Sequence, residues 1–280
     1  DMQILGNHDF DNGIDSLARN ISLSKADWLS ANYQFADPKL AKRFLPYKVY
    51  DIDGKRIGFF GINLEPKGMI AEGNYDGVKY LDGIDAANAT AWWLKHREGA
   101  DVVVAVTHVG YDKSAPPTDL DLVHKSKDID IVLGGHSHTL IKPASGKEWV
   151  LNAAGDSVLV TQNAKSGEYI SEVTIELDSL GSKLPSLRQV RLGKSYDRSF
   201  DPALEAIIRP YRKGVDDLMG KVIGKSSKEL LNTEPCLLNF ISDFVDHRGS
   251  QLAGHPVDAA LMNVGSLRRS LPKGNITQGQ

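Results

Sequence analysis

The chain has 280 residues, 41% of them hydrophobic and 25% charged, which suffices for one large or two ordinary globular domains. Its 33 basic and 36 acidic residues give a net charge of −3, which argues against the basic surface typical of nucleic-acid-binding proteins. No stretch approaches the roughly 18 consecutive apolar residues of a membrane-spanning helix, and a single cysteine cannot form an internal disulfide.

The first hundred residues alternate between strand-like and helix-like segments. Residues 2–5 have the apolar character of the end of a buried strand, and residues 13–24 show the helical spacing of apolar side chains. Residues 47–63 predict a hairpin, because an Asp-Gly turn separates two β-rich runs. The spacing over 85–99 predicts a helix that stops at its final glycine.

Further strands follow in the middle of the chain. Residues 100–110 are apolar on both faces, which predicts a central strand of a covered sheet. A short helix over 118–127 leads into a second buried strand within 128–138. Three more strands are then predicted in succession, at 157–162, 169–178 and 187–192. Helix–strand alternation followed by a run of strands predicts an α/β fold, with layers packed around a mixed sheet.

The character of the sequence changes near residue 199. Residues 199–220 begin with an Asp-Pro helix start and are rich in charge, so we expect a connector helix there, kinked by Pro210. This divides the chain into a first domain at 1–198, the connector, and a second domain at 221–280. Since few residues follow the connector, we expect the second domain to be incomplete.

Three polar segments stand at the ends of predicted strands: Leu-Gly-Asn-His-Asp-Phe-Asp-Asn-Gly at 5–13, Thr-His-Val-Gly at 107–110 and Gly-Gly-His-Ser-His at 134–138. Ligands of open α/β sheets gather beyond the carboxyl ends of the strands, so these segments should face one crevice. Imidazole and amide oxygen are suitable ligands for Zn²⁺, Mn²⁺ or Fe. Taken singly, His108 could be a structural hydrogen-bonding residue and the Gly-Gly-His-Ser-His segment a simple turn; their occurrence together favours a metal site.

These segments, in this order, resemble the later signature blocks of the calcineurin-like metallophosphoesterases, and more narrowly of the bacterial 5′-nucleotidase/UDP-sugar hydrolase family. Residues 258–277 resemble the nucleotide-binding domain that follows the catalytic domain in that family. The resemblance implies a four-layer αββα catalytic sandwich followed by a partial α/β nucleotide-binding domain. It also implies a location in the periplasm or at the cell surface.

The resemblance implies two divalent metal ions, chosen among Zn, Mn, Mg, Fe and Co. Asn7, His108 and His136 match ligands of one metal, and His138 matches a ligand of the other, where many relatives have Gln. The family's first two blocks, Asp-x-His and Gly-Asp, do not occur in this sequence. They supply the remaining metal ligands, so we expect them upstream in a longer polypeptide.

The resemblance also implies residues that act on the phosphate. His8 matches a histidine that faces the phosphoryl group without binding metal, and Asp11 matches the carboxylate that orients its ring. Asp9 corresponds to a position usually held by Glu and is expected to be structural. In the implied reaction, the two metals activate a water for attack on phosphorus while His8 neutralises charge and protonates the leaving oxygen.

The second domain carries the expected substrate-binding residues. The family's Asn-Gly-Gly-x-x-Arg motif is matched by Asn263, Gly265 and Arg268, with Val264 at the place of the first glycine. A guanidinium offers a bidentate fork to a phosphate. Arg248, near the end of a predicted helix, is a further candidate, with a solvated helix-end cation as the equally supported alternative.

The resulting hypothesis is metal-dependent hydrolysis of nucleotide phosphate esters, of the 5′-nucleotidase type. The expected partner is a small-molecule nucleotide rather than a nucleic-acid polymer. Within the same family, 2′,3′-cyclic-nucleotide phosphodiesterase, UDP-sugar hydrolase and a sulfur-oxidising relative remain alternatives. A degenerate nucleotide-binding module without catalysis is the alternative from another class, and retention of the six site residues of the first domain argues against it. A purely structural protein is disfavoured by the polar crevice.

Overall fold

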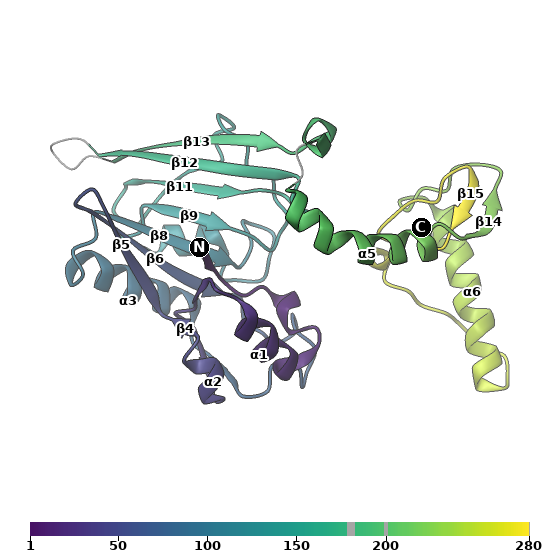
Figure 1. The fold of residues 1–280 in the computed structure, drawn as a ribbon. Coiled ribbons are helices and arrows are strands. Elements are labelled where there is room, and N and C mark those ends of the chain that lie inside the picture. The colour runs from purple at the N-terminus through teal and green to yellow at the C-terminus, as the bar shows by residue number, and fades with distance from the viewer. Residues whose placement is uncertain (178–182, 199–200, 280) are drawn as a thin grey trace. The chain divides into compact units, whose positions relative to one another are not determined.

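The computed structural model describes residues 1–177, 183–198 and 201–279, in two units at Asp1–Ser195 and Tyr196–Gln280 (Figure 1). Residue 178, expected at the end of a strand, and residues 199–200, expected at the start of the connector helix, lie outside the described residues. So does residue 280, the last of the expected second domain. Among the described helices, none has the length and apolar content needed to cross a membrane.

A six-stranded sheet lies at the centre of the first unit. Its order is β10 (Trp149–Leu151), β11 (Ser157–Gln162), β9 (Ile131–Gly134), β8 (Val102–His108), β6 (Lys55–Asn63) and β5 (Tyr47–Ile52). The four inner strands are parallel, and the two outer ones pair antiparallel to their neighbours. Asn63 pairs with His108, and Gln162 pairs with Gly134. The carboxyl ends of the parallel strands therefore meet at one edge of the sheet.

The hairpin expected at 47–63 is confirmed as β5 and β6. Asp53 and Gly54 have φ values of 53° and 76°, the left-handed conformation that a two-residue type I′ turn requires at both positions. The Gly54 N–H donates to Asp51 Oδ1 at 3.0 Å. The turn thus fixes the register in which β5 pairs with β6.

Two helices pack on one face of the six-stranded sheet, of which the longer, α3 (Gly83–His96), is labelled in Figure 1. This helix begins two residues earlier than expected because Asp82 accepts hydrogen bonds from the backbone of Ile84 and Asp85, at 2.9 Å each. The shorter, α4 (Asp119–His124), follows a Thr118 cap and stops before the expected residue 127. Buried apolar residues of both helices pack on the sheet, including Ala87, Leu94, Leu122, Val103 and Val132.

The hairpin β12 (Tyr169–Leu177) and β13 (Lys183–Arg191) packs on the opposite face of the six-stranded sheet. Val173 and Ile175 of β12 contact a cluster of four buried residues, Val102, Val104, Ile131 and Leu159. Apolar side chains of the two sheets thus pack against each other, and the helices lie on the other face of the six-stranded sheet. The predicted α/β class is confirmed.

A smaller layer holds the start of the chain. Strands β1 (Met2–Gln3), β2 (Asp27–Leu29) and β4 (Phe44–Leu45) form a parallel sheet, and β3 (Tyr33–Phe35) pairs with β7 (Val78–Tyr80). The 3₁₀ turn η1 (Asn7–Phe10) and helices α1 (Gly13–Leu23) and α2 (Pro38–Ala41) lie beside them. Phe10, Leu17 and Ile21 are fully buried, so their packing anchors the polar residues of η1 at the surface.

The second unit begins within the 3₁₀ turn η2 (Lys194–Arg198) and continues with helix α5 (Pro202–Met219), which contains Pro210. Asp201 caps this helix through the backbone N–H groups of Ala203 and Leu204. The unit then holds β14 (Val222–Ser226), α6 (Pro235–Ala253), the 3₁₀ turn η3 (Val264–Ser266) and β15 (Gly274–Thr277), which pairs with β14. A helix is therefore present where we expected a connector; its role between two domains remains a prediction.

Candidate functional site

The tight turn after β1 presents Asn7. Gly6 is extended, and its N–H donates to Asp9 Oδ2 at 2.7 Å, which closes the turn. Asp9 therefore has the structural role that we expected for it. Asn7 begins the 3₁₀ turn and is partly buried. Its Oδ1 atom lies 3.1 Å from Nε2 of His108, 101 residues further along the chain.

Two glycines make room for the ring of His108, the last residue of β8. A Cβ atom on Gly6 would lie 2.9 Å from His108 Cε1 and 3.0 Å from Nε2. A Cβ atom on Gly135 would lie 3.1 Å from Nδ1 of the same ring. Any larger residue at these two positions would press on the imidazole, so both glycines serve the placement of His108.

His136 joins this pair from the loop after β9. Its ring centroid lies 5.2 Å from that of His108, with 59° between the ring planes. Both His136 and His138 adopt the left-handed conformation, with φ values of 77° and 56°. Such positions cost on the order of 1–3 kcal/mol each for residues other than glycine, and they cluster at functional sites. The loop therefore holds its two histidines against a local preference.

Burial and mutual repulsion favour neutral imidazoles in this cluster. The pKa of His108 is lowered to about 4, chiefly by burial and then by the positive charge that His136, His8 and His138 would carry. Burial, and then His138 and His8, also lower the pKa of His136. Both rings are thus neutral at pH 7, which is the protonation state that a metal ligand needs.

The residues present fit part of the coordination shell of a divalent metal. Nitrogen of His108 and amide oxygen of Asn7 approach each other, and His136 lies beside them, all three from strand ends. In the described parts of the chain, no three His, Cys, Asp or Glu side chains are grouped closely enough to hold a metal by themselves. His138 is exposed and interacts with the other two histidines electrostatically. The structure thus brings together Asn7, His108 and His136.

His8 and Asp11 form a pair on the same turn as Asn7. His8 Nδ1 lies 2.9 Å from Asp11 Oδ2, and the two side chains are 80% and 61% exposed. The Asn74 side chain donates to the Asp11 carbonyl at 3.0 Å, which ties this segment to the loop before β7. The His8 ring is therefore oriented through one nitrogen, while most of its surface is open to an incoming molecule.

Asp119 is a buried acid beneath the site that the sequence alone did not single out. It is fully buried at the start of α4, and its Oδ1 accepts from Thr107 Oγ1 at 2.6 Å. Its Oδ2 has no hydrogen-bond partner among the described residues. This oxygen lies so close to Gly134 that a Cβ atom at that position would overlap it. In the sequence, Asp119 is indistinguishable from an ordinary first-turn acid of a helix.

We expect Asp119→Asn to change how stability depends on pH. Burial raises the pKa of Asp119 to about 7, against an unfolded value of about 3.9. Between these values the native state binds the extra proton, so raising the pH through this window lowers the free energy of unfolding, by roughly 4 kcal/mol at most. In Asp119→Asn the side chain is an amide that does not titrate, so this fall in the free energy of unfolding does not occur. Denaturant unfolding of both proteins from pH 4.5 to pH 8 measures the difference.

His108 has the opposite effect on stability over part of this pH range. Because its pKa is lowered to about 4, the free energy of unfolding rises as the pH increases from about 4 to about 6.5. The comparison of Asp119→Asn with the parent protein cancels this contribution. Parallel stability curves for the two proteins would contradict the assignment of a raised pKa to Asp119.

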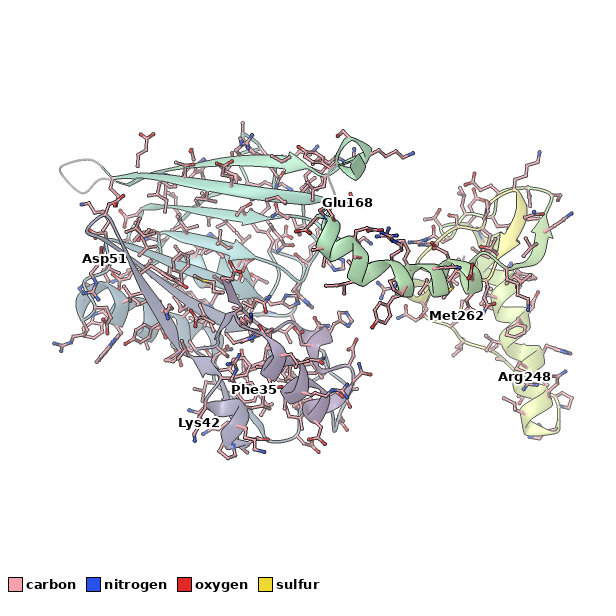
Figure 2. The ribbon with its side chains drawn as sticks, viewed as in Figure 1. Phe35, Lys42, Asp51, Glu168, Arg248 and Met262 are labelled. Carbon is pink, nitrogen blue, oxygen red and sulfur yellow. The ribbon has the colours of Figure 1, made fainter. Side chains whose placement is uncertain are left out.

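The expected substrate residues of the second unit lie at its surface. Asn263 Oδ1 accepts from the Gly265 N–H at 2.9 Å, which closes the turn before Arg268. Arg268 is exposed and lines a pocket of about 290 Å³ with Leu237 and Ile241 of α6. Arg248 lies on α6, which continues beyond it to Ala253 (Figure 2), and its guanidinium donates to Gln251 Oε1 at 2.9 Å. The Arg248 guanidinium therefore already has a hydrogen-bond partner on its own helix.

Residues 2–140 match the family described as Calcineurin-like phosphoesterase. This range contains the strand-end residues Asn7, His108 and His136 and the pair of His8 and Asp11. The chain carries a calcineurin-like phosphoesterase domain. Divalent metals belong to the chemistry of this family, which agrees with the neutral nitrogen and oxygen donors gathered at the strand ends of the phosphoesterase domain.

Known relatives extend the likeness beyond the phosphoesterase domain. The chain is 27% identical over 309 residues to a 5′-nucleotidase-related protein from Glossina morsitans morsitans, with 99% of this chain and 53% of the relative covered. It is 26% identical over 316 residues to the 5′-nucleotidase of Vibrio cholerae, with 99% and 56% covered. The chain therefore spans about half the length of these relatives.

A solved structure shows the same fold. The chain superposes on the crystal structure of a 5′-nucleotidase precursor from Thermus thermophilus with a TM-score of 0.78 and 28% identity. The superposition covers 99% of this chain and 56% of that one. The phosphoesterase domain and the elements after it thus follow the order found in a 5′-nucleotidase structure.

Proposed function

We propose that the protein hydrolyses phosphate esters of nucleotides in a metal-dependent reaction, as a 5′-nucleotidase. The convergence of Asn7, His108 and His136, next to the pair of His8 and Asp11, carries this proposal. The family match and the 5′-nucleotidase relatives support it. Two divalent metals are proposed, with Asn7, His108 and His136 as ligands of one and His138 as a ligand of the other.

The chain's own residues supply distinct parts of the chemistry. Metals bound at the strand ends would supply Lewis-acid activation of water and of the phosphoryl oxygens. His8, exposed and held by Asp11 through Nδ1, would direct Nε2 toward the phosphoryl group. There it stabilises charge that develops on the oxygens and delivers a proton to the leaving group. The neutral rings of His108 and His136 are ready to bind metal without first losing a proton at pH 7.

The second unit would hold the remainder of the nucleotide. Arg268 is exposed beside an apolar pocket, so its guanidinium is available to an anionic group while the pocket takes a flat or apolar one. Asn263 shapes the turn that leads to Arg268. We propose residues 1–198 as the catalytic domain, 199–220 as a connector and 221–280 as part of the substrate-binding domain.

We expect Arg268→Ala to raise the KM for AMP about tenfold while kcat changes little, since the guanidinium acts in binding rather than in the chemical step. Arg269→Ala is the matched control, because the neighbouring side chain is also an exposed arginine beside the same pocket. Steady-state phosphate release over a range of AMP concentrations measures both constants. Equal KM values for the two variants would contradict the assignment of Arg268.

A substrate panel tests the proposed reaction against its alternatives. Phosphate release from AMP, hydrolysis of 2′,3′-cyclic AMP and cleavage of UDP-glucose are measured with and without added Mn²⁺ or Zn²⁺, using the protein expressed from its complete coding sequence. The proposal expects AMP to be the fastest substrate. Preference for the cyclic nucleotide or the UDP-sugar would identify a different reaction of the same family. Nucleotide binding without turnover would identify the non-catalytic alternative.

The proposed location is the periplasm or the cell surface. This location follows from the family resemblance, together with the small-molecule nucleotide proposed as the substrate. Fractionation of cells that express the complete protein tests the location, with phosphate release assayed in each fraction.

A further inference from the structure

Gln162 lies directly behind the loop that carries His136 and His138. It is the last residue of β11, pairs with Gly134 of β9, and is only 2% exposed. A buried amide must place its two N–H donors and its oxygen on partners, because an unpaired polar group is costly away from water. The partners that Gln162 finds are all in the histidine loop.

The Gln162 amide binds three residues of this loop. Its Nε2 donates to the carbonyl of Gly135 at 2.8 Å. Its Oε1 accepts from the Thr139 N–H at 2.6 Å and from Ser137 Oγ at 2.9 Å. Residues 135, 137 and 139 thus alternate along the chain with His136 and His138. One side chain holds the backbone before, between and after the two histidines.

Ser137 extends these contacts to a third element. Its hydroxyl accepts from the Tyr111 N–H at 3.0 Å and lies 2.8 Å from Thr139 Oγ1. The Ser137 hydroxyl donates its proton to Gln162 Oε1, so the Thr139 hydroxyl donates to Ser137. The direction of each hydrogen bond made by these two hydroxyls is therefore defined. Tyr111 is itself fixed by its hydroxyl, which donates to the carbonyl of Lys147 at 2.9 Å.

The backbone conformation of the loop explains why these hydrogen bonds are needed. His136 and His138 both have positive φ, a conformation that their own side chains disfavour and that persists only where the surroundings determine it. The Gln162 contacts lie on either side of both strained residues. Releasing them would let the loop relax toward ordinary φ values and would move the two imidazoles.

We propose that Gln162 is a positioning residue that fixes His136 and His138 in the geometry needed to bind metal. This inference rests on the proposed function only in taking the two histidines as metal ligands. Gln162 need not touch metal or substrate itself. It acts through the loop, in the way that partners behind metal ligands orient those ligands in other metal sites.

The test is Gln162→Leu in the complete protein, with Co²⁺ titrated into metal-free protein and followed by visible absorption, which reports the ligands and their arrangement. We expect metal affinity to fall about 10–100-fold and the Co²⁺ spectrum to change. Thr161→Val is the matched control, since it removes a buried hydroxyl one residue earlier, where Thr161 contacts Ser171 rather than the loop. The control should keep the parent affinity and spectrum.

Ser137→Ala provides a second, milder variant that removes one of the three contacts, should Gln162→Leu fail to fold. We expect a weaker effect in the same direction, with an unfolding midpoint close to that of Thr161→Val. Parent-like Co²⁺ affinity and spectrum in folded Gln162→Leu or Ser137→Ala would overturn the inference. Since metal binding is measured directly, a protein that binds Co²⁺ but releases no phosphate would count against the proposed reaction and leave this test intact.

Discussion

Replacing His108 by asparagine should reduce metal-dependent phosphate release from AMP by at least about a thousandfold. His108 is the most buried of the clustered histidines, lies 3.1 Å from Asn7 and beside His136, and is neutral at pH 7. Its removal would leave one proposed metal without a central ligand, and a metal supplies several kcal/mol of transition-state stabilisation. Initial rates at saturating Mn²⁺, together with metal content per protein, measure the effect.

His96→Asn is the control for this substitution. His96 lies at the end of α3, where its Nε2 is 3.2 Å from Asp128, and its side chain is about half exposed. The same change of residue type at this position should leave both rate and metal content unaltered. If folded His108→Asn retained the parent rate and the parent metal content, His108 could not be a metal ligand.

His8→Gln should lower kcat by about 10²–10⁴-fold while the metal content stays at the parent value. His8 is proposed to act on the phosphoryl group and the leaving oxygen, and its exposed side chain contributes little to packing. Its exposed pair with Asp11 is worth at most about 1 kcal/mol of stability, so the variant should unfold as the parent does. The measurement is kcat at saturating AMP and metal, with bound metal determined on the same sample.

Asp11→Asn separates orientation from chemistry. The ring of His8 remains, but the carboxylate that lies 2.9 Å from its Nδ1 is replaced by an amide. We expect a smaller loss of kcat than for His8→Gln, again with unchanged metal content. An unchanged kcat in His8→Gln, or a loss explained wholly by missing metal, would contradict the assigned role.

Local sequence patterns predicted most of the elements that position the site. The hairpin at 47–63 follows from an Asp-Gly turn, and the strand that ends at His108 follows from a continuous apolar run. The rule that ligands gather beyond the carboxyl ends of strands predicted that the segments of Asn7, His108 and His136 face one crevice, and the structure brings these three residues together.

The supporting residues could not be predicted, because their roles depend on contacts between distant parts of the chain. Gln162 reaches a loop about 25 residues earlier in the sequence, and as one polar residue at a strand end it carries no local signal. Asp119 is defined by burial against Thr107 and Gly134, which only the packing of α4 creates. Gly6 and Gly135 stand within the polar segments of the sequence, but their role in making room for the His108 ring depends on the packing of these segments against each other.

The proposed metal site is tested most directly by locating bound metal in crystals of the complete protein grown with Zn²⁺, by anomalous scattering at the zinc absorption edge. We expect an anomalous peak in contact with Asn7, His108 and His136. An otherwise well-ordered structure without a peak at these three residues, or with zinc held only elsewhere, would contradict the proposal that these residues form part of a metal-dependent phosphoesterase site.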